Sequence, residues 1–291
     1  MPTRAARSAR SQPRLRRPKK LAGRLLAHLV LLAASAIFVI PLLFMVSTSL
    51  KSHRQIQTWP PIWIPNPILW RNYSDVFDYA PLHRYFWNTV LIALCSVFGA
   101  TVTSSLAAYA FARLRAPGRN LLFFVLLGTL MVPGIVTLVP TYIIFSKLGW
   151  IDTFLPLTVP ALLGSPFHIF LLRQFFMTIP QDLEDAALID GCSRAGIWWR
   201  IMLPLARPGL TTVAVFAFMW AMNDFMGPLI YLNSKRLYTL SLGLQVFTRS
   251  HGTEWGMLMA ASTMMVTPVI LIFFLAQRQF VQGITLTGMK G

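Results

Sequence analysis

The chain has 291 residues, of which 55% are hydrophobic and only 12% are charged, and its mean hydropathy is +0.59. Soluble domains carry about 25% charged residues, so this composition excludes an ordinary soluble enzyme and predicts a protein embedded in a lipid bilayer. The two cysteines, Cys95 and Cys192, are widely separated. They therefore give neither a disulfide framework nor the spacing of a zinc site.

The formal net charge of +17 is unevenly distributed. Residues 1–24 hold nine of the 26 basic residues and no acidic residue. Three prolines discourage helix there, so we expect a disordered cytoplasmic arm that contacts anionic lipid headgroups. A DNA-binding role is a weaker alternative, and we expect no nucleic-acid partner. A cleaved signal peptide is also disfavoured, because the apolar run that follows is too long.

Six windows are apolar enough to cross a membrane core of about 30 Å, which takes about 20 residues of helix. They run from Leu25 to Leu50, Tyr85 to Ala110, Asn120 to Phe145, Phe154 to Phe175, Gly209 to Leu232 and Trp255 to Gln277. Residues 25–291 are thus expected to form one all-α integral membrane domain. Prolines in or near several windows predict kinks.

The basic residues outside the spans indicate the orientation. One side of the membrane receives 18 Lys and Arg residues, including those of both chain ends, and the other side receives eight. Since basic residues accumulate on the cytoplasmic side, both termini are expected there. The loop at about 178–208, between the fourth and fifth spans, is then cytoplasmic too.

The outer segment at 51–84 is rich in proline and tryptophan. Its aromatic residues are typical of the membrane interface. A docking surface for an external partner is the alternative, and the two readings are compatible.

The cytoplasmic loop has the pattern of two short helices. Thr178 and Pro180 predict the start of the first, and the sequence places three acids, Asp182, Glu184 and Asp185, in its first turns, where they complement the helix dipole. Gly191 predicts a sharp end to this helix.

Ser193 is the expected N-cap of the second helix. This helix carries Ile197, Ile201 and Leu205 at helical spacing, with Pro204 and Pro208 expected to end it. The thin alanine face of the first helix suits a groove on another protein. An interfacial helix lying on the headgroups is the alternative.

The order acid-Ala-Ala, three residues, Gly, nine residues, Ile, one residue, Leu-Pro resembles the EAA loop of permease subunits of binding-protein-dependent ABC importers. Further matches resemble the carbohydrate branch, specifically the maltose-transporter-type second permease. These are Tyr109-Ala110-Phe111-Ala112-Arg113, Asn223-Asp224-Phe225, Pro228-Leu229-Ile230, Thr239-Leu240, Leu242-Gly243-Leu244, Phe280-Val281-Gln282-Gly283-Ile284-Thr285 and Gly288-Met289-Lys290-Gly291. The resemblance covers roughly residues 25–291.

The resemblance implies a six-helix permease fold with a cytoplasmic coupling helix between the fourth and fifth spans. The residues that it assigns to ATPase coupling are Glu184, Asp185, Ala186, Ala187, Asp190, Gly191, Ile201, Leu203 and Pro204. One departure concerns the glutamate position of the motif, which is Asp185 here, with Glu184 immediately before it. We expect either Asp185 or Glu184 to make the main contact. The tail departs as well, with Met289 where a small residue is more common.

The resemblance also implies a division of labour. The chain lacks the P-loop pattern, since no Gly-Lys pair occurs in it. We therefore expect a non-catalytic subunit with no cofactor of its own, whose partners bind ATP and Mg²⁺. The implied partners are a homologous second permease, two ABC ATPase subunits, an extracytoplasmic solute-binding protein and a sugar. The implied location is a bacterial or archaeal cell (inner) membrane.

Three alternatives stay open. An ion-coupled secondary transporter needs ionisable residues at mid-membrane, and Asp224 is the sole carboxylate within the predicted spans. Its role is open between sugar hydroxyls, an interhelical hydrogen bond and a cavity wall. A permease for a non-sugar solute and a nonconducting scaffold are the others. The candidate substrate-pathway residues are Thr141, Tyr142, Asn223, Asp224 and Tyr231.

Overall fold

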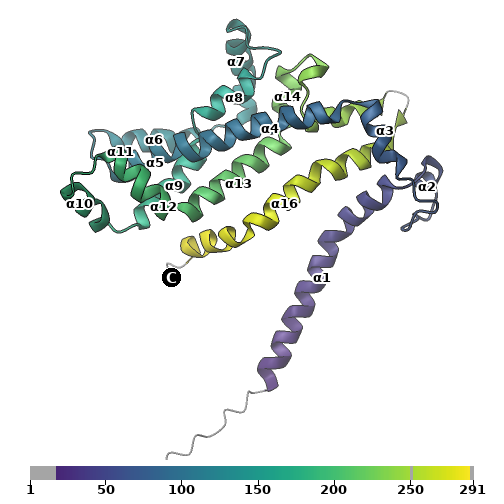
Figure 1. The fold of residues 1–291 in the computed structure, drawn as a ribbon, viewed down its shortest axis with the longest axis horizontal. Helices are drawn as coiled ribbons and strands as arrows, with labels where there is room; N and C mark the ends of the chain where they lie inside the picture. The colour runs from purple at the N-terminus through teal and green to yellow at the C-terminus, as the bar shows by residue number, and fades with distance from the viewer. Residues whose placement is uncertain (1–17, 250–251, 289–291) are drawn as a thin grey trace, which may run out of the picture.

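The computed structural model describes residues 18–249 and 252–288, which are mostly helical. Figure 1 shows the arrangement of these helices. In chain order they are α1 (Pro18–Ser49), α2 (His53–Gln57), α3 (Arg71–Tyr79), α4 (Leu82–Phe98), η1 (Gly99–Thr103), α5 (Ser104–Arg113), α6 (Arg119–Thr129), α7 (Gly134–Lys147), α8 (Leu155–Leu162), α9 (Pro166–Thr178), α10 (Asp182–Ile189), α11 (Arg194–Ile197), η2 (Trp198–Met202), α12 (Leu203–Leu205), α13 (Arg207–Asn223), α14 (Met226–Tyr231), η3 (Lys235–Leu237), α15 (Leu240–Gly243), η4 (Leu244–Phe247) and α16 (Trp255–Gly288). Two short antiparallel strands, β1 (Thr248–Arg249) and β2 (Gly252–Thr253), precede α16.

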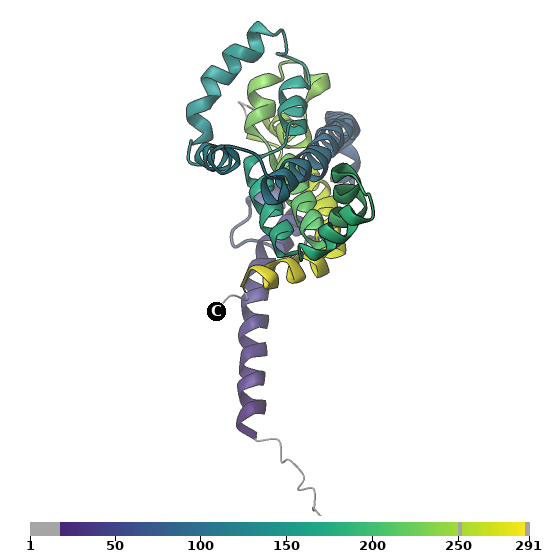
Figure 2. The same ribbon diagram turned by 90° about the vertical axis from the view of Figure 1, so that its left-hand side faces the viewer.

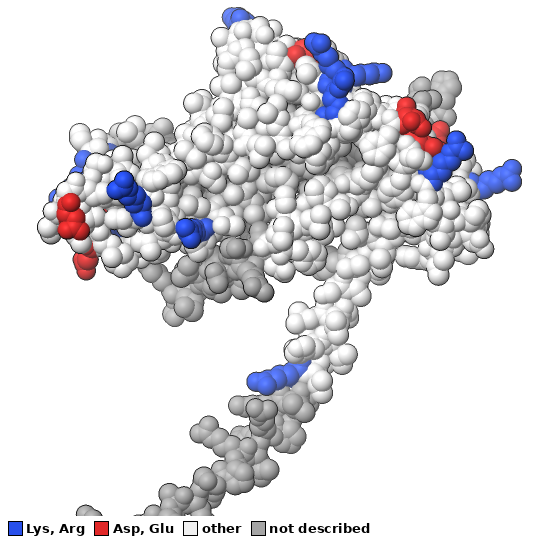
Figure 3. All heavy atoms as spheres, in the orientation of Figure 1, with Lys and Arg blue, Asp and Glu red and all other residues white. Residues whose placement is uncertain are grey.

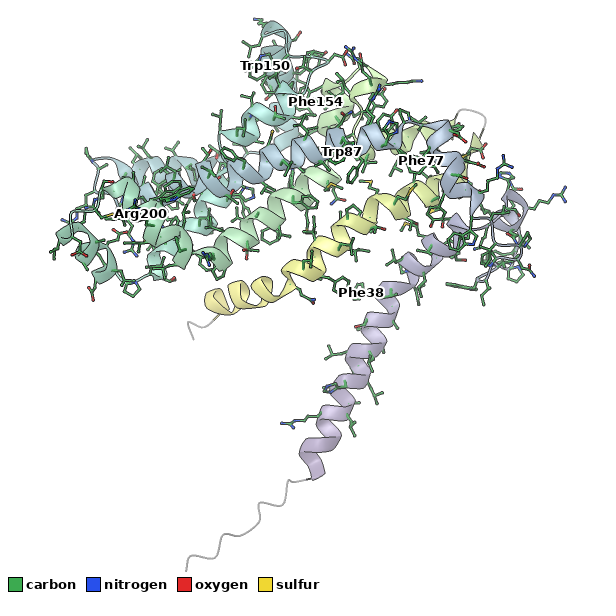
Figure 4. All side chains as sticks on the ribbon, in the orientation of Figure 1. Phe38, Phe77, Trp87, Trp150, Phe154 and Arg200 are labelled. Carbon is green, nitrogen blue, oxygen red and sulfur yellow. The ribbon has the colours of Figure 1, made fainter. Side chains whose placement is uncertain are left out.

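Helices α4, α13 and α16 run along the long axis of the molecule (Figure 1). Helix α13 packs against both α4 and α16, and α5 packs against α9. Helix α1 contacts α16 and then extends away from the other helices, as both views show (Figure 2). Most of the described side chains of α1 are apolar and exposed, including Phe38, which is labelled in Figure 4. Such a surface needs lipid or another helix against it.

Helix α1 begins at Pro18, so it includes the last residues of the arm that we expected to be disordered. Proline is favoured in the first turn of a helix because its missing N–H leaves no hydrogen bond unmade there. The rest of the expected arm, residues 1–17, lies outside the described residues.

Four helices of the described residues are long and apolar enough to cross a membrane: Gly23–Ser49, Leu82–Arg113, Leu155–Thr178 and Trp255–Leu275. They correspond to the first, second, fourth and sixth predicted spans. Two bent helix pairs, Arg119–Thr129 with Gly134–Lys147 and Arg194–Leu205 with Arg207–Asn223, raise the number to six if each pair is one span. The third expected span is therefore bent, whereas the bend of the second pair lies at Ala206, before the fifth expected span begins.

The third predicted span is broken where Pro133 precedes Gly134, and its two halves, α6 and α7, meet at 98°. The fifth was predicted to run to Leu232, but α13 ends at Asn223. There the carboxylate of Asp224 accepts a hydrogen bond from the backbone N–H of Gly227 at 3.0 Å. This local bond starts the separate helix α14, because a side chain that satisfies backbone groups competes with helix continuation.

Two hydrophobic clusters hold the helices together. One contains Ala108, Leu172, Ile197 and Val213, and so joins α5, α9, α11 and α13. The other contains Val76, Tyr85, Met222 and Phe247 and joins α3, α4, α13 and η4. Charged side chains on the face shown in Figure 3 gather over α10–α11, over α2–α3 and at the top near α7 and α14, and they leave a largely uncharged band across the middle. This band is the surface expected of a protein surrounded by lipid.

Close helix packing depends on glycine at one crossing. A Cβ placed on Gly99 would lie 1.9 Å from the carbonyl oxygen of Ala161. We expect Gly99→Ala to lower the free energy of unfolding by about 1–3 kcal/mol, the usual range for overpacking, because η1 and α8 must separate. Thermal unfolding of the detergent-solubilised protein measures this change.

Gly128→Ala in α6 is the matched control, since nothing lies within 4 Å of its added Cβ. Alanine also favours helix over glycine, so the control should be at least as stable as the unchanged protein. Equal melting temperatures for the two variants would contradict the packing explanation.

Candidate functional site

The predicted cytoplasmic loop forms the end of the molecule at which α10 and α11 lie (Figure 1). Helix α10 begins at Asp182, two residues after Pro180, whereas Thr178 ends α9. The expected helix start at Thr178 was therefore too early. Asp182, Glu184 and Asp185 lie in the first turn, as predicted. Gly191 follows the helix with φ of 79°, a left-handed conformation that disfavours any side chain, which confirms the predicted bend.

The central contact of this loop is the carboxylate of Glu184, whose side chain is 3% exposed. Its Oε1 lies 3.5 Å from Nε of Arg113, at the end of α5. Its Oε2 lies 3.6 Å from Nη1 of Arg194, at the start of α11. Glu184 therefore connects α10 to the helices that lie on both sides of it in the fold.

Arg113 connects the same helix to α9. Its Nη2 donates a hydrogen bond to the carbonyl oxygen of Phe176 at 2.6 Å and another to that of Ile179. These carbonyls belong to the last turn of α9 and to the residue after it, where helical backbone bonds run out. One guanidinium thus satisfies the end of α9 and pairs with α10, as the fork geometry of arginine permits.

Burial raises the pKa of the Glu184 carboxyl. Arg113 and Arg194 counteract this increase, and the neighbouring Asp185 adds to it. The two arginines thus offset a desolvation penalty rather than adding a large net stabilisation, which is the usual balance for a buried ion pair.

The opposite face of α10 is exposed. It includes Leu183, Asp185, Ala186 and Ile189, and Ile189 retains 86% of its surface. Of the acid-Ala-Ala motif, Asp185 and Ala186 face outward, while Ala187 is buried in the cluster that also contains Ile197. Asp190 and Gly191 are exposed as well. The structure thus divides the predicted coupling residues between an outer face and an inner face.

The second helix of the loop buries a different set of residues from the predicted Ile197, Ile201 and Leu205. Ser193 caps it, accepting a hydrogen bond from the N–H of Gly196 at 3.1 Å, as predicted. The fully buried residues are, however, Ile197, Met202 and Ala206, while Leu205 is 49% exposed. The π-helical turn η2 (Trp198–Met202) inserts one extra residue into the repeat and so shifts the buried stripe after Ile197.

Pro204 and Pro208, which were both expected to end this helix, occupy different positions in the structure. Pro204 lies exposed within α12, which continues to Leu205, so this proline does not end the helix. Pro208 belongs to the first turn of α13, after the break. Ile201 and Leu203 are half-buried and pack on the cluster around Met202. Arg200 marks this end of the molecule in Figure 4.

The structure brings some of the predicted pathway residues together. Tyr142 of α7 and Tyr231 of α14 stack, with ring centroids 6.3 Å apart and planes at 11°. Thr141 donates to the carbonyl oxygen of Thr137 in its own helix. The side chain of Asn223 is exposed and bonds to the carbonyl oxygen of Met219. Asp224 holds the start of α14, so its observed bond is local rather than interhelical.

Sequence reasoning missed Asp152, in the loop between α7 and α8. Its φ is 60°, and its Oδ1 accepts hydrogen bonds from the N–H groups of Asn233 and Ser234 at 2.9 and 2.7 Å. Its own N–H donates to the carbonyl oxygen of Tyr231. Hydrogen bonds from Ser234 lower the pKa of the Asp152 carboxyl. Asp152 thus fixes the segment after α14 next to the aromatic pair; the motif Trp150-Ile151-Asp152 gave no signal for this.

The outer segment at 58–70 carries exposed tryptophans, among them Trp59 at 86% and Trp70 at 69% exposure. Trp63 has an aromatic partner, since its ring meets that of Phe44 edge-on. Exposure of this kind suits both readings of the segment, the membrane interface and an external partner.

The geometry around Glu184 predicts an asymmetric response to mutation. Arg113→Gln should lower the free energy of unfolding by about 3–5 kcal/mol, because it leaves a buried carboxylate without its main counter-charge. Glu184→Gln should cost only about 1 kcal/mol, because Arg113 keeps its two carbonyl acceptors. Thermal unfolding at pH 7 compares them.

The pH dependence provides the control. A raised folded-state pKa means that the contribution of Glu184 is greatest below the unfolded pKa and is lost as pH rises through the folded pKa. Arg113→Gln should steepen that loss, and adding Glu184→Gln to it should remove the loss. Equal destabilisation by both single variants at every pH would show that the buried carboxylate of Glu184 does not depend on Arg113 to offset its desolvation penalty.

Comparisons with known proteins identify the family of the chain. Residues 100–286 match the family described as binding-protein-dependent transport system inner membrane component. The chain is 33% identical over 264 residues to the sulfoquinovosyl glycerol transport system permease protein of Agrobacterium fabrum, covering 89% of this chain and 93% of that protein. It is 33% identical to the arabinooligosaccharides transport system permease protein of Halalkalibacterium halodurans, covering 88% and 92%.

Solved structures show the same fold. A bacterial ABC transporter involved in import of the acidic polysaccharide alginate matches with a TM-score of 0.78 at 20% identity, covering 92% of this chain and 99% of that one. The MetNI methionine ABC transporter matches less fully, with a TM-score of 0.52 over 69% of this chain and 95% of that one. The sequence matches and the shared fold together show that the chain belongs to the family of inner membrane components of binding-protein-dependent transport systems.

Proposed function

We propose that the chain is a transmembrane pathway subunit of an ATP-driven sugar importer. Two of its relatives, at 33% identity over most of both chains, are named as permeases for sulfoquinovosyl glycerol and for arabinooligosaccharides. A third, the sn-glycerol-3-phosphate transport system permease protein of Yersinia enterocolitica, is 32% identical and covers 88% of this chain. This range supports a sugar or polyol derivative as the substrate class.

In the proposed topology the bent pair α6–α7 forms the third span and α13 forms the fifth, which with the four long helices gives six spans with both termini in the cytoplasm. The excess of Lys and Arg on the side of the α10 loop supports this orientation. The chain is then a multi-pass protein of a bacterial or archaeal cell membrane, with α10 on the cytoplasmic side.

The observation that carries the proposal is the outer face of α10, an exposed strip of small, acidic and apolar side chains. Asp185 is the acid of the motif that faces outward, so it makes the main contact with an ATPase subunit. Ala186 keeps the strip thin enough to enter a groove, and Ile189 supplies apolar area. Glu184 belongs to the same motif but acts from inside, by fixing how α10 is presented.

The proposed partners follow from two features of the chain: its sequence has no P-loop pattern, and α10 has an exposed outer face. Two ATPase subunits bind ATP and Mg²⁺, one of them gripping this α10 and the other the equivalent loop of a homologous second permease. An external solute-binding protein delivers the sugar. The stacked pair Tyr142–Tyr231 offers aromatic faces beside the segment fixed by Asp152, and sugars stack on such faces. Thr141, Asn223 and Asp224 are the polar candidates along the same route.

The test of the coupling role is Gly191→Pro, because proline cannot adopt a φ of 79°. ATP-driven uptake by the complex in membrane vesicles should fall to background while the subunit stays in the membrane. Gly118→Pro, at a φ of 76° in the α5–α6 turn, is the matched control and should reduce uptake much less. Full uptake by the Gly191 variant would rule out α10 as the coupling element.

The same vesicles separate this function from ion-coupled transport. With ATP present, uptake should persist after the proton gradient is collapsed, because ATP hydrolysis by the partner subunits supplies the energy in the proposed function. Loss of uptake under that treatment would favour a secondary transporter.

A further inference from the structure

The polar groups on the buried side of α10 form a cluster that contacts the helix bundle, away from the face proposed to bind an ATPase. Glu184 contributes from α10, Arg194 from α11, and Tyr109 and Arg113 from α5. We call these four residues the joint. Their side chains come from elements on both sides of the loop, so the joint spans the boundary between the cytoplasmic loop and the helix bundle.

Tyr109, Arg113 and Glu184 of the joint are buried, whereas the side chain of Arg194 is half exposed. The buried part is incompletely hydrogen-bonded. In the part of the chain whose side chains the structure describes, Nε of Arg113 and Oε1 of Glu184 are both buried without a hydrogen-bond partner, although they lie only 3.5 Å apart. Nε1 of Trp198, in the adjacent π-helical turn, shares this condition. Buried polar groups are satisfied in the great majority of cases, so their gathering at one place indicates an element with more than one arrangement.

The π-helical turn η2 also supports an element with more than one arrangement. Helix η2 leads directly from α11 into α12, and such turns are frequent at functional sites in helices. Trp198 lies on η2 and packs against the same hydrophobic cluster as Tyr109, which meets the ring of Phe176 edge-on. The joint therefore lies between the loop and the packed pair α5–α9.

The geometry points to the joint as the route by which movement of α10 reaches the spans, through Arg113 into α5 and α9. This inference rests on the proposed function, since it assumes that an ATPase moves α10. It adds Arg113 to the coupling residues that the resemblance implied, which included Ile201, Leu203 and Pro204 of the second helix of the loop. In the structure Pro204 is exposed and Ile201 only half-buried, whereas the Arg113 side chain is 9% exposed.

Arg113 is a positioning residue in this scheme. It holds the carbonyl oxygens of Phe176 and Ile179 and faces Glu184, so α9 and α10 cannot move apart without breaking its contacts. Helix α5 packs against α9 along its length. A displacement of α10 by about 1–2 Å, the usual size of helix shifts at interfaces, therefore moves α5 and α9 together.

Hydrogen exchange of the purified complex tests this route without knowledge of the sugar. The complex is isolated through a tag on this chain, and exchange is measured with and without trapping by Mg-ATP and orthovanadate. In the unchanged protein, trapping should alter exchange in α10 and also in the last turns of α5 and α9. Glu184→Gln breaks both ion pairs, so it should abolish the change in α5 and α9 while the change in α10 remains.

Arg115→Gln, two residues beyond Arg113 and exposed, is the matched control and should behave as the unchanged protein. If Glu184→Gln does not assemble, the double variant Arg113→Gln/Glu184→Gln removes one charge of each sign, leaves the net charge of the joint unchanged and should give the same loss. An undiminished change in α5 and α9 in either variant overturns the inference but leaves the proposed function intact. Failure of trapping to alter α10 itself, or of any ATPase to co-purify, contradicts the proposed function and with it the inference.

Discussion

The buried carboxylate of Glu184 is the contact on which the arrangement of the loop that carries α10 and α11 depends. It lies between Arg113 at the end of α5 and Arg194 at the start of α11. A helix turns once in about 3.6 residues, so burying Glu184 and Ala187 on one side directs Asp185, Ala186 and Ile189 to the other. The face offered to a partner is thus set from within the subunit.

The loop is also continuous with the helix bundle. Ala187 of α10 and Ile197 of α11 belong to the same hydrophobic cluster as Leu172 of α9 and Val213 of α13. Close contacts reinforce this end of the bundle, since a Cβ on Gly209 would lie 2.7 Å from the ring of Phe175. Helices in lipid associate by such close packing rather than by the hydrophobic effect. A partner that moves α10 therefore acts on a packed assembly and not on a loose connection.

Hydropathy predicted the long helices well, because spans such as α1 and α16 are continuous apolar runs. It missed the breaks in the third and fifth spans, since an averaged window does not register a local bond such as that between Asp224 and Gly227. Pro133 beside Gly134 was among the prolines that predicted kinks, and it marks the break in the third span. The π-helical turn at 198–202 was beyond prediction, because it depends on packing around Met202 rather than on the order of residue types.

The sequence predicted where the loop lies in the chain, but it did not predict which of its side chains are buried and which are exposed. The spacing from Asp185 to Pro204 identified the loop. Helical periodicity alone, however, does not tell which of the two adjacent acids is buried, because that depends on where the partner arginine lies. Arg113 appeared among the matching residues, but nothing in its own neighbourhood connects it to Glu184. Their pairing exists only once α5, α9 and α10 meet in space, and it resolves which acid faces outward.

Site-specific crosslinking tests most directly whether the outer face of α10 meets an ATPase. Single cysteines replace Asp185 or Glu184 in a chain without Cys95 and Cys192, and membranes holding the whole complex are treated with a short bifunctional thiol reagent. The account predicts a crosslink from position 185 to the ATPase subunit and none from position 184. A crosslink from position 184 alone, or labelling of position 185 by a membrane-impermeant reagent added outside intact cells, would contradict it.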